Sequence, residues 1–473
     1  MLDDNGPYED QSATLVEQVM SSVRKQISSR QATPGVKLPS LRAMSQRHNV
    51  SKSTVVEAYD RLAAEGAIHS RPGSGFFVST NIPPFAIADA GPDLDREVDP
   101  IWLARQSLEP DSYRFQPGCG WLPKSWMPEE EIRRALRNLA RRDSTDLTHY
   151  GSPRGLLELR QLLSRRLADN GVTASAEQIL LTDSGTHAID LICRFLLEPG
   201  DKVLVDDPCY FNFHAMLRAH RIEVVSVPYT PLGPDLDAFE QVLEQHKPRV
   251  YITNSSVQNP TSASLSPLTA HRVLKLAEQH DLMIIEDDTF NDFEHTPSPR
   301  LAAFDGLERV IHIGSFSKTL SAATRCGFIS ARPDWIEGLV DLKLATSFSS
   351  SALSPEIILL LLKDGAYRKH ITRLRDKLAK SMPFVVSQLA ELNIKPWHLP
   401  TAGMFLWCEL PNGIDAAKLA RCALRDSVVL APGNAFSQSQ SAANFMRFNI
   451  AQSQDAQIYP LIRNAFNRLA VDH

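Results

Sequence analysis

Apolar residues spaced four apart form the first repeated pattern in the chain. Between Thr14 and Ser29, the apolar positions Leu15, Val19, Val23 and Ile27 are separated by mostly polar residues. Since this spacing places the four side chains on one face of a helix, the segment predicts an amphipathic helix. Pro34 and Gly35 come next and predict a turn.

Two shorter helices are predicted from residues that commonly cap helices. Ser40 is the expected N-cap of the first, whose apolar face is Leu41 and Met44. Ser51 is the expected N-cap of the next, which spans Lys52–Glu65 and is stopped by Gly66. The apolar face of this third helix consists of Val55, Ala58, Tyr59 and Leu62.

A hairpin and a change in composition follow these helices. Ala67–Arg71 and Gly75–Ser79 are predicted as two short strands, joined at a tip of sequence PGSG. Residues 81–110 are rich in proline and aspartate and have no clear period, which favours a linker. We therefore expect a first domain over residues 12–80, built from three helices and a two-stranded wing.

Apolar strands alternate with helical stretches from about residue 111 onward. This alternation is typical of an α/β domain with a mainly parallel sheet. We expect the domain to span residues 111–473 and to include a smaller C-terminal α+β subdomain over about 361–473. The predicted strands are 178–182, 202–206, 223–227, 249–253, 282–286 and 310–314, and the clearest helices are 186–197, 210–219 and 267–280.

Composition narrows the class of protein. At 473 residues the chain exceeds one domain, and 43% hydrophobic with 22% charged residues is ordinary globular material. The six cysteines are scattered without CxxC spacing, which argues against a zinc or thioredoxin-like site and for a reduced cytosolic location. The acidic start of the chain is unlike a signal peptide, and the longest apolar stretch is too short to span a bilayer.

Charge is distributed unevenly, and this changes the expected partner. The whole chain carries a net charge of -5, yet residues 14–80 hold nine basic and four acidic side chains. Local positive charge is what contact with DNA phosphates needs. In a winged helix-turn-helix the third helix enters the major groove. The candidate DNA contacts are its first residues, Ser51, Lys52, Ser53 and Thr54, and Arg71 in the wing.

Lys318 is the most unusual residue of the larger domain. It lies in the sequence GSFSKTL, directly after the apolar run Val310–Ile313, where a lysine is out of place unless it is bonded. Pyridoxal 5′-phosphate is an aldehyde cofactor that bonds to a lysine amine. Such a cofactor also needs a carboxylate at its pyridine nitrogen, helix-start amides and a cation at its phosphate, an aromatic cover and a donor to its phenolic oxygen.

The chain supplies a candidate for each requirement at the end of a predicted strand. Asp287 could pair with the pyridine nitrogen, Tyr210 could cover the ring, and Asn259 could donate to the phenolic oxygen. The phosphate candidates are Gly185, Thr186, Ser315, Ser317 and Arg325. Arg447 could bind a substrate or effector carboxylate in a bidentate way. Taken singly, each of these residues has an ordinary structural explanation, such as a turn, a core position or a solvated surface.

Residues 37–78 resemble the DNA-binding domain of GntR-type bacterial regulators. The resemblance rests on KLPSLRAMSQRHNVSKSTVVEAYDRLAAEGAIHSRPGSGFFV. It implies that Arg42, the start of the third helix and Arg71 contact operator DNA.

The larger domain resembles the fold type I aminotransferases over most of residues 111–473. The matching segments include HYGSPRGLLELR, TDSGTHAIDL, DDPCYFNF, VQNPTSASLS, IIEDDTF, GSFSKTLSAATRCGFI, TAGMFLWCELP and FMRFNIA. The resemblance implies the roles above for Lys318, Asp287, Asn259, Tyr210, Arg325 and Arg447. It also matches Tyr150 to a tyrosine that reaches the phosphate of a neighbouring subunit, which implies a homodimer. The two halves together resemble the MocR-type regulators.

Three features depart from the aminotransferase pattern. Phe290 stands where a tyrosine often meets the phenolic oxygen, Gly185-Thr186 replaces a Ser-Gln pair, and Ser262 replaces a glycine. These changes leave cofactor binding expected and place efficient transamination in question.

Three functions remain open at this point. The first is a nucleoid-associated transcription factor whose larger domain senses pyridoxal phosphate or an amino compound that replaces Lys318 on the cofactor. The second is an active aminotransferase with an appended DNA-binding domain. The third is a cofactor-free relic whose larger domain only dimerises.

Overall fold

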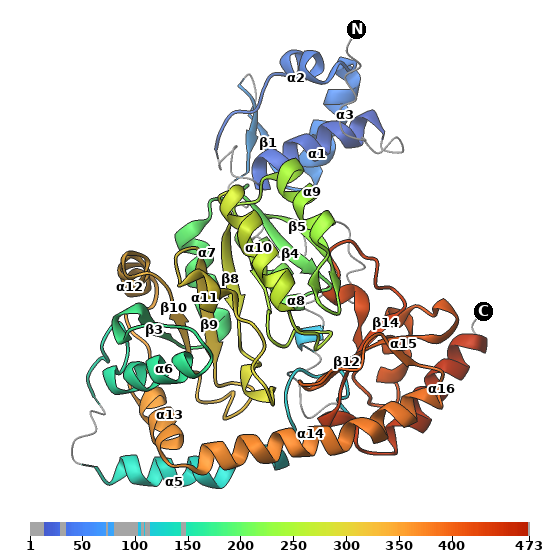
Figure 1. Cartoon of the computed structure of the whole chain (residues 1–473). Coiled ribbons are helices and arrows are strands. Elements are labelled where there is room, and N and C mark those ends of the chain that lie inside the picture. Colours follow the sequence, from blue (N-terminus) through green and yellow to red (C-terminus); the bar gives the residue numbers. More distant parts are fainter. Residues whose placement is uncertain are drawn as a thin grey trace. The chain divides into compact units, whose positions relative to one another are not determined.

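The computed structural model describes residues 14–28, 35–71, 74–79, 103–105, 108, 114–142 and 148–471. The chain divides into two units, Met1–Asp89 and Ala90–His473 (Figure 1). Apart from residues 103–105 and 108, the predicted linker over 81–110 lies outside the described residues.

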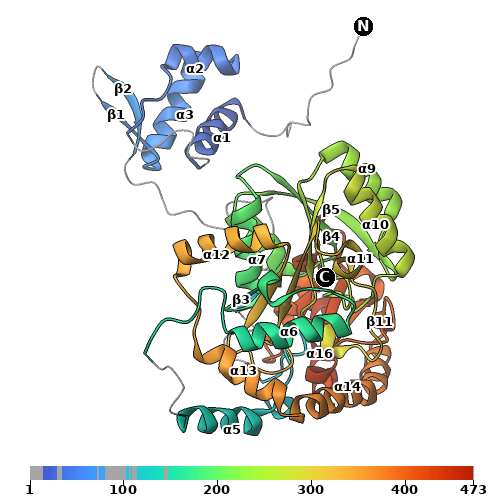
Figure 2. The same ribbon diagram turned by 60° about the vertical axis from the view of Figure 1, so that its left-hand side comes forward.

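The N-terminal unit contains the three predicted helices and the wing (Figure 2). Helix α2 is capped by Ser40 and α3 by Ser51, whose side chains accept hydrogen bonds from Ala43 N and Thr54 N. These capping bonds, and Gly66 in a left-handed conformation after α3, confirm the predicted boundaries. The elements are α1 (Leu15–Ser28), α2 (Leu41–His48), α3 (Lys52–Ala64) and the antiparallel strands β1 (Ile68–Arg71) and β2 (Gly75–Val78).

One side of each helix forms the core of this unit. Val19, Val23 and Ile27 of α1 are buried against α3, as the spacing predicts. Leu15 belongs to the same spacing but is 54% exposed, at the first residue of α1.

An eight-stranded sheet forms the centre of the larger unit, in the order β3-β10-β9-β8-β7-β4-β5-β6. All six predicted strands are present, and β5, β4, β7, β8 and β9 run parallel in neighbouring pairs. The strands are β3 (Ile179–Thr182), β4 (Lys202–Asp207), β5 (Glu223–Thr230), β6 (Gly233–Pro234), β7 (Val250–Thr253), β8 (Met283–Asp287), β9 (Val310–Ser315) and β10 (Gly327–Ser330).

β10 was not among the predicted strands. It is antiparallel to both β3 and β9 and lies between them.

Helices cover both faces of this sheet. Ile284 of β8 packs into one hydrophobic cluster and Ile285 into the other, because successive side chains of a strand point to opposite faces. On one face lie α7 (Gly185–Leu196), α8 (Phe211–Ala219) and α12 (Pro333–Ser347). The other cluster includes α6 (Leu157–Asp169), α9 (Leu236–His246), α10 (Pro267–Gln279), α11 (Leu301–Asp305) and α13 (Leu353–Lys363).

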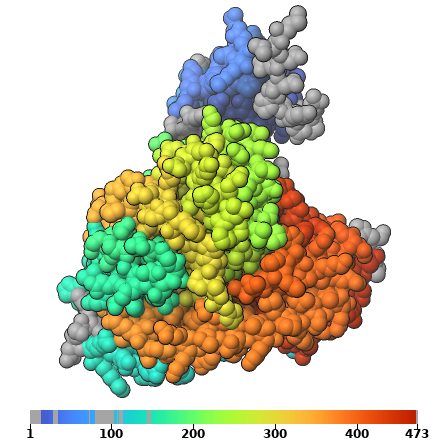
Figure 3. Space-filling view, viewed as in Figure 1, coloured from blue at the N-terminus to red at the C-terminus, as the bar shows by residue number. Residues whose placement is uncertain are grey.

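A smaller antiparallel sheet, in the order β11-β12-β14-β13, forms the C-terminal part of this unit. The long helix α14 (Ala366–Ala390) runs along the large unit toward this sheet, and Figure 3 shows the C-terminal part in orange and red beside the large sheet's helices. The remaining elements are α5 (Glu129–Ala140), β11 (Lys395–Pro396), β12 (Phe405–Glu409), α15 (Ala416–Leu424), β13 (Ala431–Pro432), β14 (Phe445–Asn449) and α16 (Ile458–Val471).

Two absences hold for the described part of the chain. None of its helices has both the length and the apolar composition that crossing a bilayer requires. Within the same residues, no group of three histidine, cysteine or acidic side chains is arranged to hold a metal ion.

A carboxyl group buried in the large sheet makes stability depend on pH. Asp206 of β4 accepts hydrogen bonds from Tyr251 Oη at 2.5 Å and Thr253 Oγ1 at 2.7 Å. Burial raises the pKa of its carboxyl to about 7, whereas an aspartate in an unfolded chain titrates near pH ~4. Between these two pH values the folded protein holds a proton that the unfolded chain releases.

We expect Asp206→Asn to flatten the pH dependence of stability. Because the native wild type binds the extra proton, its free energy of unfolding falls as pH rises from about 4 to 7, with a slope of up to about 1.4 kcal/mol per pH unit. The variant keeps an acceptor oxygen but cannot titrate. Urea denaturation of both proteins between pH 5 and 8 measures the two slopes, and parallel curves would contradict the prediction.

Candidate functional site

Lys318 lies three residues beyond the end of β9, in a turn at the edge of the large sheet. Its Nζ donates a hydrogen bond to the carbonyl oxygen of Gly120 at 2.8 Å. Burial lowers the pKa of this amine to about 8, and the nearby positive charge of Arg447 contributes to the lowering, while Asp287 opposes the shift. More of the amine is therefore neutral and nucleophilic at physiological pH than in an ordinary lysine.

Asp287 is the last residue of β8 and is buried. Its Oδ1 accepts hydrogen bonds from Thr289 N at 3.1 Å and Thr289 Oγ1 at 2.6 Å. Burial raises the pKa of the carboxyl, and these two donors oppose that rise. The side chain is thus fixed beside the Lys318 turn by a threonine that sequence analysis did not single out.

Asp288, the next residue, belongs to a buried ionic network behind the site. Its Oδ2 lies 3.2 Å from both Arg300 Nε and His312 Nε2, and the positive charge of Arg300 holds the pKa of the carboxyl below its usual range despite burial. The network joins β8, β9 and the start of α11, so it fixes the strand end that presents Asp287.

Arg447 of β14 reaches the same place from the smaller sheet. Its Nη1 donates to Asn259 Oδ1 at 2.7 Å, and its Nη2 donates to the carbonyl oxygen of Gly118 at 2.7 Å. The guanidinium lies over the rings of Phe405 and Phe436. Its buried Nε has no hydrogen-bond partner among the described residues, and burial lowers the pKa of the group to about 10. A buried cation with an unused donor is suited to bind an anionic ligand.

Tyr210 precedes α8 and lies within the electrostatic reach of these groups. Burial raises the pKa of its hydroxyl to about 12, with Asp287 adding to the rise and Arg447 opposing it. A Cβ atom placed on Gly120 would lie 3.8 Å from both Lys318 Nζ and Arg447 Nη2. The fold therefore brings Lys318, Asp287, Tyr210, Asn259 and Arg447 close to one another from different elements.

The N-terminus of α7 lies at the same sheet edge. Ser184 caps the helix by accepting from His187 N, which leaves the first N–H groups at Gly185 and Thr186 for a ligand. A Cβ on Gly185 would lie 3.4 Å from Thr289 Oγ1 and 3.6 Å from the Cβ of Ser315. The hydroxyls of Ser315 and Ser317 are 3.0 Å apart, so the turn, both serines and Lys318 are close neighbours.

His187 is oriented away from a cofactor role. Its Nδ1 lies 3.3 Å from Asp183 Oδ2 and accepts from Asp183 N.

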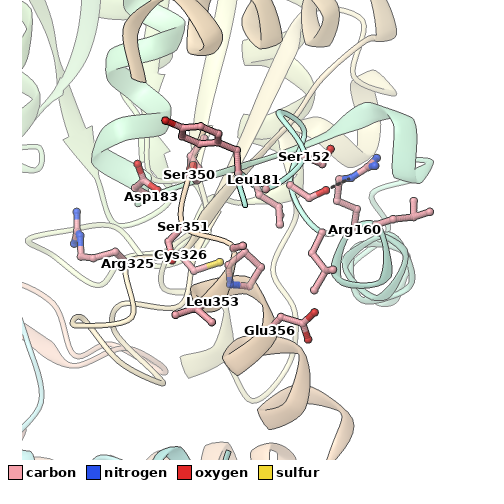
Figure 4. Close-up of a pocket in the computed structure, with 18 of the residues that line it drawn as sticks. Ser152, Arg160, Leu181, Asp183, Arg325, Cys326, Ser350, Ser351, Leu353 and Glu356 are labelled. Atoms are coloured by element: carbon pink, nitrogen blue, oxygen red, sulfur yellow. Dashed lines mark hydrogen bonds between the residues drawn. The ribbon is translucent and has the colours of Figure 1, made fainter. Parts of the chain in front are cut away.

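Arg325 and Tyr150 line a cavity of about 490 Å³ next to the turn that carries Lys318. Figure 4 shows Arg325 and Asp183 on one side of the cavity and Arg160 on the other. Arg325 is exposed and has a left-handed backbone (φ 45°), and its charge also acts on the pKa of Lys318. Tyr150 is 79% exposed and packs edge-on against the exposed ring of Phe348.

The candidate DNA contacts lie on the surface of the N-terminal unit. Arg42, Ser51, Lys52, Ser53 and Arg71 are exposed, and Thr54 is partly buried. Ser51 Oγ lies 2.7 Å from the hydroxyls of both Ser53 and Thr54, so its capping role is satisfied within the protein. The guanidinium of Arg71 lies over the ring of Phe77, which supports it on the wing.

Sequence reasoning missed the segment that closes the site from the N-terminal side. In this segment the carbonyl oxygen of Gly118 accepts from Arg447, and that of Gly120 accepts from Lys318. Asn449 of β14 donates to the carbonyl oxygen of Cys119 between them. None of Gly118, Gly120 and Asn449 was a candidate. Two glycines in the sequence Gly118-Cys119-Gly120 were the available signal, because closely spaced glycines permit close approach of the backbone.

Two protein families match the chain. Residues 122–464 match the aminotransferase class I and II family, and residues 15–78 match the gntR family of bacterial regulatory proteins. The HTH-type transcriptional regulator YdcR of Escherichia coli K12 is 30% identical over 449 residues, which cover 92% of this chain and 94% of YdcR. The HTH-type transcriptional regulator NorG of Staphylococcus aureus USA300 is 27% identical, over 86% of this chain and 94% of NorG.

Solved structures match the larger unit. The α-aminoadipate aminotransferase LysN of Thermus thermophilus, in complex with N-(5′-phosphopyridoxyl)-L-leucine, has a TM-score of 0.70 and 27% identity over 82% of this chain and all of LysN. The kynurenine aminotransferase of Pyrococcus horikoshii, in complex with PMP, has a TM-score of 0.70 and 26% identity over 78% of this chain and 94% of its own.

Proposed function

This chain belongs to the MocR-type GntR regulators, in which a GntR winged helix-turn-helix is joined to a class I and II aminotransferase domain, and we propose that its larger domain senses pyridoxal 5′-phosphate or an amino compound. The protein is thus a transcriptional regulator of fold type I aminotransferase architecture. The observation that carries the proposal is the proximity of a partly buried lysine, a buried carboxylate and a buried arginine in a chain that also carries a GntR winged helix-turn-helix.

The residues at the site fit pyridoxal phosphate. When bound, the cofactor supplies an aldehyde that bonds to amines and a pyridine ring that withdraws electrons. Lys318 provides an amine whose pKa is about 8, and Asp287 can hold a proton at the pyridine nitrogen. Tyr210 would cover the ring, and Asn259 can donate from its amide nitrogen because Arg447 already uses its oxygen. We assign the phosphate to the amides of Gly185 and Thr186 with Ser315, Ser317 and Arg325.

Arg447 points to the class of effector. Both Nη groups already donate to neutral oxygens, and the unpartnered Nε and the positive charge remain for an anion. A carboxylate is the planar anion that a guanidinium recognises best. We therefore propose that the effector carries both an amine, to replace Lys318, and a carboxylate, to bind Arg447.

We further propose a homodimer, which the cavity surface supports. Tyr150, Phe348 and Leu353 are large exposed hydrophobic residues at or beside the cavity that Arg325 lines. A second copy of the chain would cover these side chains and let Tyr150 reach the partner's phosphate group. A symmetric dimer carries two winged helix-turn-helix units and therefore suits a repeated or palindromic operator. We place the protein at the nucleoid, in the cytoplasm.

Phe290 favours sensing over turnover. It is 4% exposed and packs edge-on against Phe405, three residues after Asp287. Its ring offers no hydroxyl for the phenolic oxygen, so the proton and electron distribution of the cofactor is less well tuned than an enzyme requires. An aminotransferase with an appended DNA reader remains the alternative.

We expect turnover far below that of an enzyme. With a panel of amino acids and 2-oxoglutarate, the cofactor-loaded full-length protein should turn over at well under ~1 per second, because typical enzymes reach ~1–1000 per second. Product formation measured by mass spectrometry tests this, and Phe290→Tyr should raise any residual rate by restoring the hydroxyl. Turnover within the enzymatic range would overturn the sensor proposal.

Binding of duplex DNA tests the regulator part of the proposal. The duplex is selected from a random pool by the full-length protein and is called the selected duplex below.

A further inference from the structure

A short segment, residues 114–121, closes the site, and we call it the strap. Four consecutive carbonyl oxygens of the strap accept hydrogen bonds from side chains. Arg447 Nη2 donates to Gly118 at 2.7 Å, and Asn449 Nδ2 donates to Cys119 at 2.9 Å and to Trp121 at 2.8 Å. Lys318 Nζ donates to Gly120 at 2.8 Å. The lysine therefore holds the strap to the large sheet, while β14 holds it to the small one.

The first half of the strap is built into the edge of the small sheet. Phe115 pairs in parallel with Val428, and Gly118 N donates to Val429 O at 2.9 Å. Asn449 N donates to Pro117 O at 2.7 Å. A Cβ on Gly118 would lie 2.5 Å from the backbone of Leu430 and Ala431, so only glycine permits this approach. The first half of the strap is thus fixed to the small sheet, whereas Lys318 connects Gly120 to the large sheet.

Chain order connects the strap to the DNA reader. The strap follows the segment 81–110 that joins the two units in sequence. Within that segment Leu103 is fully buried against Trp407 and Phe436, and the ring of Phe436 lies 4.7 Å from the guanidinium of Arg447. The chain that arrives from the N-terminal unit is therefore anchored beside Arg447 first and contacts Lys318 next.

The hydrogen bond from Lys318 Nζ to the carbonyl oxygen of Gly120 requires a free amine. Condensation of the amine with the cofactor's aldehyde forms one carbon–nitrogen double bond and releases one water, so the nitrogen keeps at most one hydrogen and is drawn to the cofactor. An amino compound that takes over that carbon returns both hydrogens to Lys318. The hydrogen bond to Gly120 is thus available without cofactor, lost on loading and available again once an amino compound has replaced the lysine.

We propose that the conformation of the strap depends on whether the amine of Lys318 is free, and that the strap transmits this state along the chain to the N-terminal winged helix-turn-helix. Asn449 is the positioning residue that holds the strap. The inference rests on the proposed function, because it requires pyridoxal phosphate on Lys318. It deepens that function by naming the segment that carries the signal.

The test compares three states of the full-length protein: cofactor-free, loaded with pyridoxal phosphate, and loaded then treated with aminooxyacetate. Aminooxyacetate takes the aldehyde carbon, frees Lys318 and carries a carboxylate for Arg447. Amide hydrogen exchange in residues 114–121 should quicken on loading and slow again with aminooxyacetate. The affinity for the selected duplex should change by about fivefold or more between the loaded and treated states.

Asn449→Asp tests the coupling itself. Aspartate keeps the oxygen that accepts from Ala451 N and Gln452 N but loses the donor to the strap. We expect the visible absorption band to remain while the change in DNA affinity falls below about twofold. The matched control is Asn444→Asp, which makes the same change at a residue that contacts Glu409 instead of the strap, and it should respond like the wild type. Gln452→Met, which removes the donor to Trp121 O at 3.2 Å, provides a milder second variant.

The outcomes separate the two proposals. A band that forms, with wild-type coupling in both Asn449→Asp and Gln452→Met, or with strap exchange equal in all three states, would overturn the strap and leave the cofactor proposal intact. Absence of any band on adding pyridoxal phosphate would overturn both.

Discussion

Lys318→Ala should abolish the visible absorption band that pyridoxal phosphate gives with the wild-type protein. The band reports the covalent bond to the lysine, and no other described group at the site combines an amine with the lowered pKa of Lys318. We expect the affinity for the cofactor to fall by at least about tenfold, or ~1.4 kcal/mol, because only the non-covalent contacts remain. Titration followed by absorbance, with equilibrium dialysis for the affinity, measures both effects.

Lys343 provides the matched control. Burial lowers the pKa of its amine to about 8 as well, but its Nζ donates to the carbonyl oxygens of Pro153 and Leu181, both at 2.9 Å. Lys343→Met should therefore keep the band. A band that survives Lys318→Ala would contradict the assignment, and a wild-type protein without a band would favour the cofactor-free interpretation.

The double variant Arg42→Ala/Arg71→Ala should lose most of its affinity for the selected duplex. Both side chains are exposed, one at the start of α2 and one on the wing, where Phe77 supports it. Arginine contacts to DNA contribute roughly 1–3 kcal/mol each when they read a base, and a lost phosphate contact lowers the salt dependence by about one ion. We expect a loss of about tenfold or more, measured by fluorescence anisotropy over a range of salt concentrations.

Two arginines of the same unit serve as controls. Arg24 pairs with Glu65 at 2.6 Å and Arg61 with Glu57 at 2.5 Å, so each charge is already matched within the protein. Arg24→Ala/Arg61→Ala should bind the duplex far better than the Arg42 and Arg71 variant. The cofactor band should be unchanged in both double variants. Equal DNA affinity for the wild type and the Arg42 and Arg71 variant would exclude the wing model.

The local elements of the fold were predictable from sequence because their causes are local. Ser40 and Ser51 cap the helices that follow them, and each capping bond spans three residues. The six predicted strands are apolar runs that need no distant partner to be recognised. The sequence did not predict β10 or the strands of the smaller sheet, which include the five-residue strands β12 and β14 as well as the two-residue strands β11 and β13.

The candidate site was predicted as a set of residue types, and the fold supplied its arrangement. Lys318, Asp287 and the Gly185 turn follow strands of one sheet, so their proximity follows from the rule that ligands bind at the carboxyl ends of parallel strands. That rule does not extend to Arg447, which comes from the second sheet, or to the strap. The partners Gly120 and Lys318 are 198 positions apart, and Asn259 and Arg447 are 188 apart.

The sequence by itself determined the two-part organisation, the helix caps and six strands of the large sheet, and it singled out Lys318 as a candidate. Those features depend on the spacing of side chains within a few residues. Only the tertiary structure decided that the chain leaving the DNA reader passes between Lys318 and Arg447, that Leu15 lies outside the core and that Asp206 is buried enough to titrate near neutrality. The reason is physical: burial and long-range hydrogen bonds depend on how the two sheets pack, and no local pattern records that packing.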